Sequence, residues 1–98
     1  MTGSRRTSAD LDPRRRKILF RAWHRGIREM DLLMGQFADA EIGTLTESEL
    51  DDFEALIEVP DRDLFSWITG TEEAPSNYDT ALFRRLKVFH THAGPIHL

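Results

Sequence analysis

The stretch HRGIREMD, residues 24–31, separates two segments that each have the apolar spacing of a helix. The segment before it, DPRRRKILFRAW, begins with an aspartate and a proline, and the segment after it, MDLLMGQFADAEI, is apolar at three- and four-residue intervals. Gly26 lies between them, and a glycine inside a helix costs about 1 kcal/mol relative to alanine. The sequence therefore predicts that Gly26 ends the first helix or bends it.

The first two helices are predicted from their caps and apolar stripes. Asp12 is an N-cap acceptor and Pro13 favours the first turn, so the first helix is expected to begin there. The buried faces of the two helices are expected to be Ile18, Leu19, Ala22 and Trp23, followed by Ile27, Met30, Leu33, Met34 and Phe37. The second helix is expected to fade over residues 39–42, with Gly43 as a terminator.

A third helix follows from a capping box at Thr46 and Glu49. Its expected buried side chains are Leu50, Phe53, Leu56 and Ile57. Pro60 is expected to stop it, because the residue before a proline disfavours the helical region.

Two further helices complete the prediction. Asp61 is expected to cap a short fourth helix, RDLFSWIT, which Gly70 ends. Its buried face is expected to be Leu64, Phe65 and Ile68, with Trp67 to the side. A capping pair at Ser76 and Asp79 is expected to begin the fifth helix, whose stripe is Tyr78, Leu82, Leu86 and Phe89.

The predicted fold class is all-α, a compact five-helix bundle with two short helices. We expect a disordered N-terminal arm at residues 1–11, a helical domain at 12–93 and a C-terminal tail at 94–98. The 98-residue chain has no cysteine, which excludes disulfides, thiolate metal sites and cysteine nucleophiles. No apolar run approaches the roughly 18 residues of a membrane span, and early acidic residues disfavour a targeting peptide, so a cytoplasmic location is expected.

Charge is unevenly distributed along the chain. Residues 1–28 hold nine Lys or Arg and two acids, a net charge of +7, whereas residues 29–63 hold one Arg and twelve acids, a net charge of −11. A basic first helix is typical of a solvated face, and also of a small helical nucleic-acid-binding protein, which is the alternative function here. The acidic body argues against that alternative, because phosphate binding needs an attractive field.

No constellation of side chains predicts an enzyme or a metal site. His90, His92 and His97 lack the three- or four-residue spacing of helical metal ligands, and no carboxylate accompanies them. The acidic run from Glu47 to Glu54 has neither the glycine nor the alternating ligands of a calcium loop. Phosphate loops, nucleotide-binding glycine fingerprints and serine elbows are absent from the sequence.

The charges around Gly26 leave two interpretations open. Across a continuous helix, Arg25 and Glu29 would share a face and could form a surface ion pair. A turn would explain the glycine alone. A contact site for a partner would explain the glycine and the surrounding Arg25, Arg28 and Glu29 together, because glycine permits close approach of another backbone.

Two motifs in this chain resemble the small SdhE-type proteins, bacterial relatives of the mitochondrial succinate dehydrogenase assembly factor. RGIRE fits their RGxxE motif at Arg25, Gly26 and Glu29, followed by the pair Met30-Asp31. FEALIEVPDRDLFSWITG resembles their second signature at Phe53, Glu54, Pro60, Asp61, Asp63, Leu64, Phe65 and Trp67. The likeness extends from about Arg15 to Phe89, in the same order and at the same spacing.

The resemblance implies an assembly factor and not an enzyme. Members of the family fold as five-helix bundles, bind the flavoprotein subunit of succinate dehydrogenase or of fumarate reductase, and promote covalent attachment of FAD to a histidine of that subunit. The flavoprotein is viewed as modifying its own cofactor, so this chain is expected to hold no cofactor stably. It is also expected to hold no metal and to act as a monomer. The expected partner-binding residues are Arg25, Gly26, Arg28, Glu29, Asp31 and Trp67.

Overall fold

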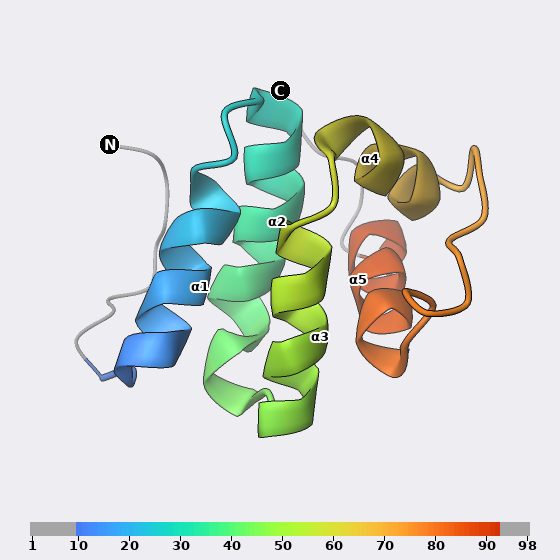
Figure 1. The fold of residues 1–98 in the computed structure, drawn as a ribbon. Helices are drawn as coiled ribbons and strands as arrows, with labels where there is room; N and C mark the ends of the chain where they lie inside the picture. Colours follow the sequence, from blue (N-terminus) through green and yellow to red (C-terminus); the bar gives the residue numbers. More distant parts are fainter. Residues whose placement is uncertain (1–9, 93–98) are drawn as a thin grey trace.

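The computed structural model describes residues 10–92 of the chain (Figure 1). Five α-helices and one short 3-10 helix form the fold, and no strand occurs within the described range. The elements in chain order are α1 (Pro13–Trp23), α2 (Arg28–Glu41), η1 (Ile42–Thr44), α3 (Glu47–Ile57), α4 (Asp61–Thr69) and α5 (Ala81–His92). The predicted all-α, five-helix architecture is confirmed.

The first three helices lie side by side, and the last two cover one end and one side of them (Figure 1). The most extensive helix–helix contact joins α1 and α2, and α3 packs against α1 and α5. α4 packs against α5 and lies beyond the end of α3. Two joints, the turn between α1 and α2 and the turn between α3 and α4, therefore lie at the same end of the bundle (Figure 1).

The core is formed by apolar side chains from all five helices, and no charged or polar residue is fully buried among the described residues. Leu11 is buried as well, so the packed domain begins before residue 12 and the predicted arm is too long at its inner end. Residues 1–9 of that arm, residue 93 and the predicted tail, 94–98, lie outside the described residues. The largest side chains at the centre are Phe37, Phe53, Phe83, Ile18, Met30 and Met34.

Two of the predicted helix caps are confirmed. The Asp12 carboxylate accepts a hydrogen bond from the backbone N–H of Arg15 at 2.8 Å, ahead of Pro13 in the first turn. Thr46 and Glu49 form a complete capping box, with bonds of 3.1 Å and 2.8 Å between each side chain and the other residue's backbone N–H. Local sequence therefore sets where α1 and α3 begin.

The other two predicted caps are wrong. Asp61 is the first residue of α4, where its side chain caps no backbone N–H, and Pro60 holds the N-cap position. The fifth helix begins at Ala81, because the hydroxyl of Thr80 accepts from the backbone N–H of Phe83 at 3.1 Å. Ser76 and Asp79 belong to the turn before it, where Asp79 N–H donates to the Pro75 carbonyl at 3.0 Å.

The buried face of α4 also differs from the prediction. Leu64, Trp67 and Ile68 are buried, whereas Phe65 is 41% exposed. Helical spacing does not choose between the two aromatic positions, because Phe65 lies three residues before Ile68 just as Trp67 lies three residues after Leu64. The Trp67 ring packs against Tyr78 with ring centroids 5.2 Å apart, so Trp67 is the aromatic core residue of this helix.

Gly35 lets α1 and α2 pack closely. It lies in the middle of α2, and a Cβ atom at this position would overlap ring carbons of Trp23, the last residue of α1. The indole N–H of Trp23 donates to Asp39 of α2 at 3.3 Å, so the ring is held on both its apolar face and its polar edge. Glycine here serves close packing and not a turn.

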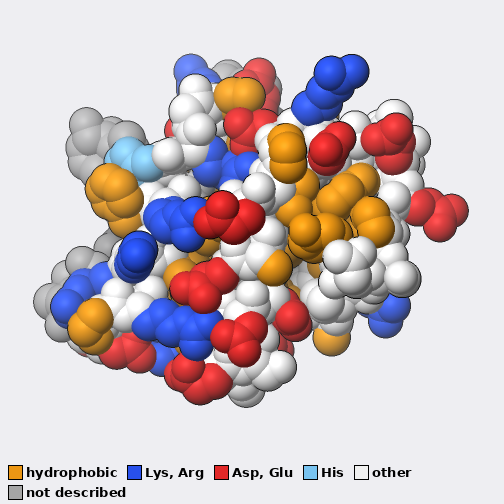
Figure 2. Space-filling view, viewed as in Figure 1, with side chains coloured by type: hydrophobic (Ala, Val, Ile, Leu, Met, Phe, Trp, Pro, Cys, Tyr) orange, Lys and Arg blue, Asp and Glu red, His pale blue; other side chains and the backbone are white. Residues whose placement is uncertain are grey.

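Ion pairs tie the basic first helix to the acidic third helix. Arg14 of α1 donates to the carboxylates of Glu47, Asp51 and Glu54 of α3 at 2.8, 2.5 and 2.8 Å. Arg85 of α5 likewise pairs with Glu41 and Glu49. Figure 2 shows blue and red side chains lying next to one another over the half of the molecule that contains α1 and α3.

The first testable consequence concerns the two aromatic residues of α4. We expect Trp67→Ala to lower the free energy of unfolding by about 3–5 kcal/mol, because a buried ring and its Tyr78 contact are lost. Phe65→Ala removes an exposed ring and should change it by no more than about 1 kcal/mol. Equilibrium denaturation of both variants is the measurement, and a larger loss for Phe65→Ala than for Trp67→Ala would contradict this placement of the core.

A second consequence concerns the α1–α2 contact. We expect Gly35→Ala to destabilise the protein by about 1–3 kcal/mol, even though alanine favours helices, because the Trp23 ring must move. The double variant Gly35→Ala with Trp23→Leu supplies space for the new methyl group. In a double-mutant cycle of thermal unfolding, the two changes should therefore be less destabilising together than their separate effects predict. Additive effects would show that Gly35 and Trp23 do not compete for space.

Candidate functional site

The turn between α1 and α2 is built around Gly26 and Asp31. Gly26 has a φ of +105°, a backbone region that glycine adopts far more readily than other residues. The Asp31 carboxylate, from the first turn of α2, accepts from the backbone N–H groups of Arg25 at 2.7 Å and Gly26 at 3.3 Å. The chain thus turns at Gly26, as one of the two sequence interpretations predicted, and Asp31 holds that turn.

The Arg25 side chain lies in the interior of the joint. Its guanidinium donates to Asp61 Oδ1 at 2.6 Å, and to the backbone carbonyls of Ile57 at 2.8 Å and Val59 at 2.6 Å. Only 7% of the side chain is exposed. The expected pair with Glu29 does not form, because Gly26 breaks the helix across which the two residues would have shared a face.

The groups around Arg25 also complement the helix dipoles. Ile57 is the last residue of α3, so the guanidinium lies where the carbonyls of that helix carry partial negative charge. Asp61 is the first residue of α4, where backbone N–H groups carry partial positive charge. One side chain therefore satisfies the end of α3 and fixes the start of α4 against the turn between α1 and α2.

The outer surface of the joint is open. No atom would come within 4 Å of a Cβ added at Gly26. Arg28 and Glu29, in the first turn of α2, are exposed, and neither side chain forms a hydrogen bond or ion pair with another residue of the range 10–92. Ile27 is 47% exposed, since it precedes the helix as its N-cap and does not join the buried stripe in which it was predicted.

A shallow pocket of about 280 Å³ adjoins this surface. Phe20 is 62% exposed there and stacks on His24, with ring centroids 3.9 Å apart. The remaining lining residues are Arg21, Arg25, Ile57, Pro60 and Asp61. Beside the pocket, a hydrogen bond from Arg21 to Glu58, together with the charges of Arg21 and Arg25, holds the pKa of the Glu58 carboxyl below its usual value.

The six residues predicted to bind a partner separate into three groups in the structure. Gly26, Arg28 and Glu29 form an exposed surface. Arg25 and Asp31 lie beneath it and hold the turn through the bonds described above. Trp67 is only 9% exposed and packs in the core against Tyr78.

Sequence reasoning missed two features of this site. Phe20 and Ile27 are exposed apolar residues, and Asp61 is the carboxylate that pairs with Arg25. A weak signal existed for Phe20, because it falls outside the predicted apolar stripe of the first helix. Nothing in the local sequence connects Arg25 with Asp61, which lie 36 residues apart.

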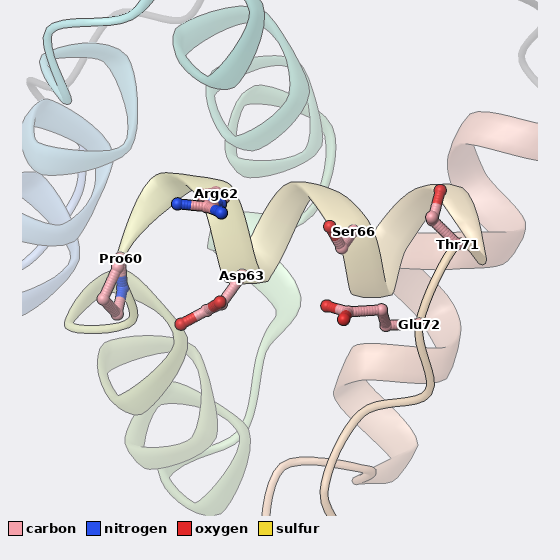
Figure 3. A pocket seen from close by; sticks show the side chains of 6 residues that line it. All are labelled: Pro60, Arg62, Asp63, Ser66, Thr71 and Glu72. Carbon is pink, nitrogen blue, oxygen red and sulfur yellow. The ribbon is translucent and has the colours of Figure 1, made fainter.

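A second hollow, of about 440 Å³, runs along the outer side of α4 (Figure 3). In Figure 3, Asp63 of α4 and Glu72 of the following loop lie on the same side of the helix, with Arg62 separate from both. The other lining residues are Pro60, Ser66 and Thr71. These side chains do not converge on one point, so the hollow has no arrangement suited to general acid–base or nucleophilic chemistry.

Metal binding finds no support in the described part of the chain, which contains no cluster of three or more potential ligands. One ring nitrogen of His90 lies 2.7 Å from the Leu33 carbonyl oxygen, and burial lowers the pKa of this histidine. His97 lies outside the described residues. Among the helices described, none combines the length and the apolar character needed to cross a membrane.

The arginines of the first helix are largely engaged within the chain. Arg14 and Arg21 pair with acids of α3 and its C-cap, and Arg16 donates to the Leu11 carbonyl at 2.8 Å. Arg15 pairs with Asp12 and also donates to two backbone carbonyls. Binding of nucleic acid by this helix would have to compete with these internal bonds, which weakens the alternative function.

The sequence of this chain matches a known family and several of its members. A family model described as flavinator of succinate dehydrogenase matches residues 16–90, which include the joint and its supporting residues. The FAD assembly factor SdhE of Acetobacter pasteurianus is 42% identical over 77 residues, covering 79% of this chain and 71% of that protein. A mitochondrial succinate dehydrogenase assembly factor 2 from Dictyostelium discoideum is 38% identical over 76 residues, covering 78% of this chain.

A mitochondrial assembly factor 2 from Debaryomyces hansenii is 34% identical over 74 residues. The chain spans about half the length of the two mitochondrial relatives, 54% and 48%. The match includes the two segments that meet at the joint, RGIREMD and VPDRDLFSW, and covers well over half of the chain. On this evidence, the chain belongs to the family of succinate dehydrogenase flavinators.

Proposed function

We propose that this chain is an assembly factor that binds the flavoprotein subunit of succinate dehydrogenase and promotes covalent attachment of FAD to a histidine of that subunit. The observation that carries the proposal is the joint between α1 and α2. Its exposed residues, Gly26 to Glu29, are held in place by partly buried bonds from Arg25 and Asp31. Family membership supplies the class of partner.

A preformed, rigid turn suits protein recognition. Gly26 offers bare backbone, so a partner's main chain can approach without meeting a side chain. Beside it, Arg28 and Glu29 have hydrogen-bonding groups that no described residue uses. Ile27 and Phe20 add exposed apolar area, which charged residues alone would not supply. Little ordering is needed on binding, which lowers its entropic cost.

The chemistry in this proposal belongs to the flavoprotein. The joint contains no nucleophile paired with a base, and its carboxylates Asp31 and Asp61 are committed to structural bonds. This chain therefore acts as a non-enzymatic factor that holds the flavoprotein in a conformation competent for attachment, without keeping FAD itself. The same proposal extends to the fumarate reductase flavoprotein as a second client, to action as a monomer and to a cytoplasmic location.

The test of the proposed function combines binding with product formation. The purified flavoprotein subunit and FAD are incubated with and without this chain, and covalent flavin is measured by in-gel fluorescence after denaturation. We expect co-purification of the two proteins and faster covalent labelling when the chain is present. Association with DNA that falls steeply with salt, together with no effect on flavin attachment, would favour the nucleic-acid alternative instead.

A third prediction tests the exposed glycine of the motif. Gly26→Arg should abolish binding and flavin attachment, because the added side chain would hold the partner away from the turn. Gly70→Arg is the matched control: Gly70 also has a positive φ, of +85°, and open space at its Cβ position, but lies at the end of α4. Both variants adopt an unfavourable backbone conformation, at a cost of about 1–2 kcal/mol.

Thermal unfolding separates stability from binding in this pair. Only Gly26→Arg should lose flavin attachment when both variants are folded. Equal activity of the two folded variants would show that the glycine serves the turn alone and that the joint is not the contact surface.

A fourth prediction separates the two charged residues of the motif. Glu29→Ala should change the free energy of unfolding by no more than about 0.5 kcal/mol, because the side chain is exposed and without a described partner. It should nevertheless weaken flavoprotein binding. Arg25→Ala should destabilise the fold by about 3 kcal/mol, because it leaves Asp61 and two carbonyls without their donor.

Denaturation curves and binding assays on the same preparations check this division. Glu73→Ala, which removes another exposed glutamate, provides the control and should leave binding unchanged. The assignment of Glu29 to the contact surface is wrong if Glu29→Ala and Glu73→Ala bind the flavoprotein equally well.

A further inference from the structure

We propose that Asp61 is a positioning residue of the partner-binding surface, acting through Arg25 on the turn at Gly26. This inference rests on the proposed function, since the surface in question is the one offered to the flavoprotein. Asp61 lies on α4 and is separated from the motif by 36 residues of sequence. Its side chain reaches the Arg25 guanidinium at 2.6 Å.

Arg25 has little hydrogen-bonding capacity left for a partner. Each of its three guanidinium nitrogens donates within the chain, to Asp61, Ile57 and Val59. With the side chain only 7% exposed, a partner would have to displace these bonds to contact the charge. We therefore expect Arg25 to affect partner binding indirectly, by holding the backbone of the turn at Gly26 in place.

Asp61 supplies the negative charge that pairs with this guanidinium. It is the one carboxylate paired with Arg25 among the described residues, and its side chain is 21% exposed. Backbone carbonyls complete the coordination of the guanidinium but carry only partial charge. The Glu58 carboxylate also lies near the Arg25 charge, but it is bonded to Arg21. Removing the Asp61 charge would therefore leave a nearly buried cation without its ion-pair partner, which is a strongly unfavourable arrangement.

Two anchors hold the exposed turn at Gly26, and the Arg25–Asp61 pair is one of them. Gly26 has no side chain and makes no packing contact at its Cβ position, so its conformation is fixed by its neighbours. One anchor is Asp31, which binds the N–H groups of Arg25 and Gly26 from α2. The other is the Arg25 side chain, which Asp61 holds from α4. Loss of the Asp61 charge should leave the turn held by Asp31 alone, so that the hydrogen bonds from the Arg25 and Gly26 N–H groups open more often.

Asp63 provides a matched control on the same helix. It lies in the first turn of α4 like Asp61, is exposed, and forms no ion pair with another described residue. Asp61→Asn and Asp63→Asn therefore remove the same charge from the same helix terminus. Only the first removes the counterion of Arg25.

The experiment compares these two variants with the wild-type chain in two assays. The first measures the dissociation constant for the flavoprotein subunit at a temperature where circular dichroism shows each protein to be folded. The second follows hydrogen exchange of individual backbone amides by NMR, a readout that distinguishes local loosening from a general loss of stability. Arg25→Lys is a second route to the same change, because lysine retains the charge but lacks the guanidinium fork that reaches three acceptors.

We expect Asp61→Asn to weaken binding by at least about tenfold, because binding must then also order the loosened turn. The amides of Arg25 and Gly26 should exchange faster while those in the middle of α2 remain protected. Asp63→Asn should stay within about twofold of wild type in both assays. If Asp61→Asn does not fold, Arg25→Lys should show the same local exchange and weaker binding.

Several results would overturn the inference. The inference is wrong if Asp61→Asn is folded and its dissociation constant stays within about twofold of that of the wild type. The same result for Arg25→Lys decides the question if Asp61→Asn does not fold. A uniform increase of exchange throughout the bundle would also overturn the inference, since it would assign Asp61 to global stability. Failure of the wild-type chain to bind the flavoprotein would instead overturn the proposed function, and is distinguishable because it precedes any comparison of variants.

Discussion

The structure depends on one nearly buried guanidinium. Arg25 lies in the turn between α1 and α2. Its three guanidinium nitrogens donate to Ile57, Val59 and Asp61, where α3 ends and α4 begins. Buried charges are stable only when they are paired and fully hydrogen-bonded, so this arrangement specifies the relative position of both joints. The ends of four helices thereby meet at Arg25. The bonds of Arg25 also position the exposed turn at Gly26.

The uneven charge of the chain has a structural explanation of the same kind. The basic and acidic segments lie next to each other in space, as α1 and α3, with Arg14 reaching three carboxylates. Exposed ion pairs contribute little individually, but shared partners reduce the conformational cost of each added bond. The basic segment and the acidic segment of the sequence thus form the two sides of the contact between α1 and α3. At the joint, Arg28 and Glu29 are exposed charges that take no part in this pairing.

The sequence predicted local features well and tertiary ones less well. The side chains of Asp12 and Thr46 accept backbone N–H groups at the starts of α1 and α3, and Gly70 ends α4 in the left-handed conformation. These are local interactions, so the three boundaries could be predicted directly. The face of α4 could not, because in a nine-residue helix several faces carry apolar residues, and only packing against Tyr78 selects Trp67 over Phe65. The motif itself was visible as a pattern. Its division into exposed and supporting residues required the bond between Arg25 and a residue 36 positions away.

The glycine of the motif shows why turn and contact are not competing explanations. A φ of +105° is enough to require glycine, so the residue needs no partner to account for it. The same conformation leaves the Cβ position facing open space, with no atom of the chain within 4 Å. A turn that demands glycine therefore also exposes bare backbone at the surface. Because Arg25 and Asp31 hold that turn in place, a partner can contact its surface without any change in the fold.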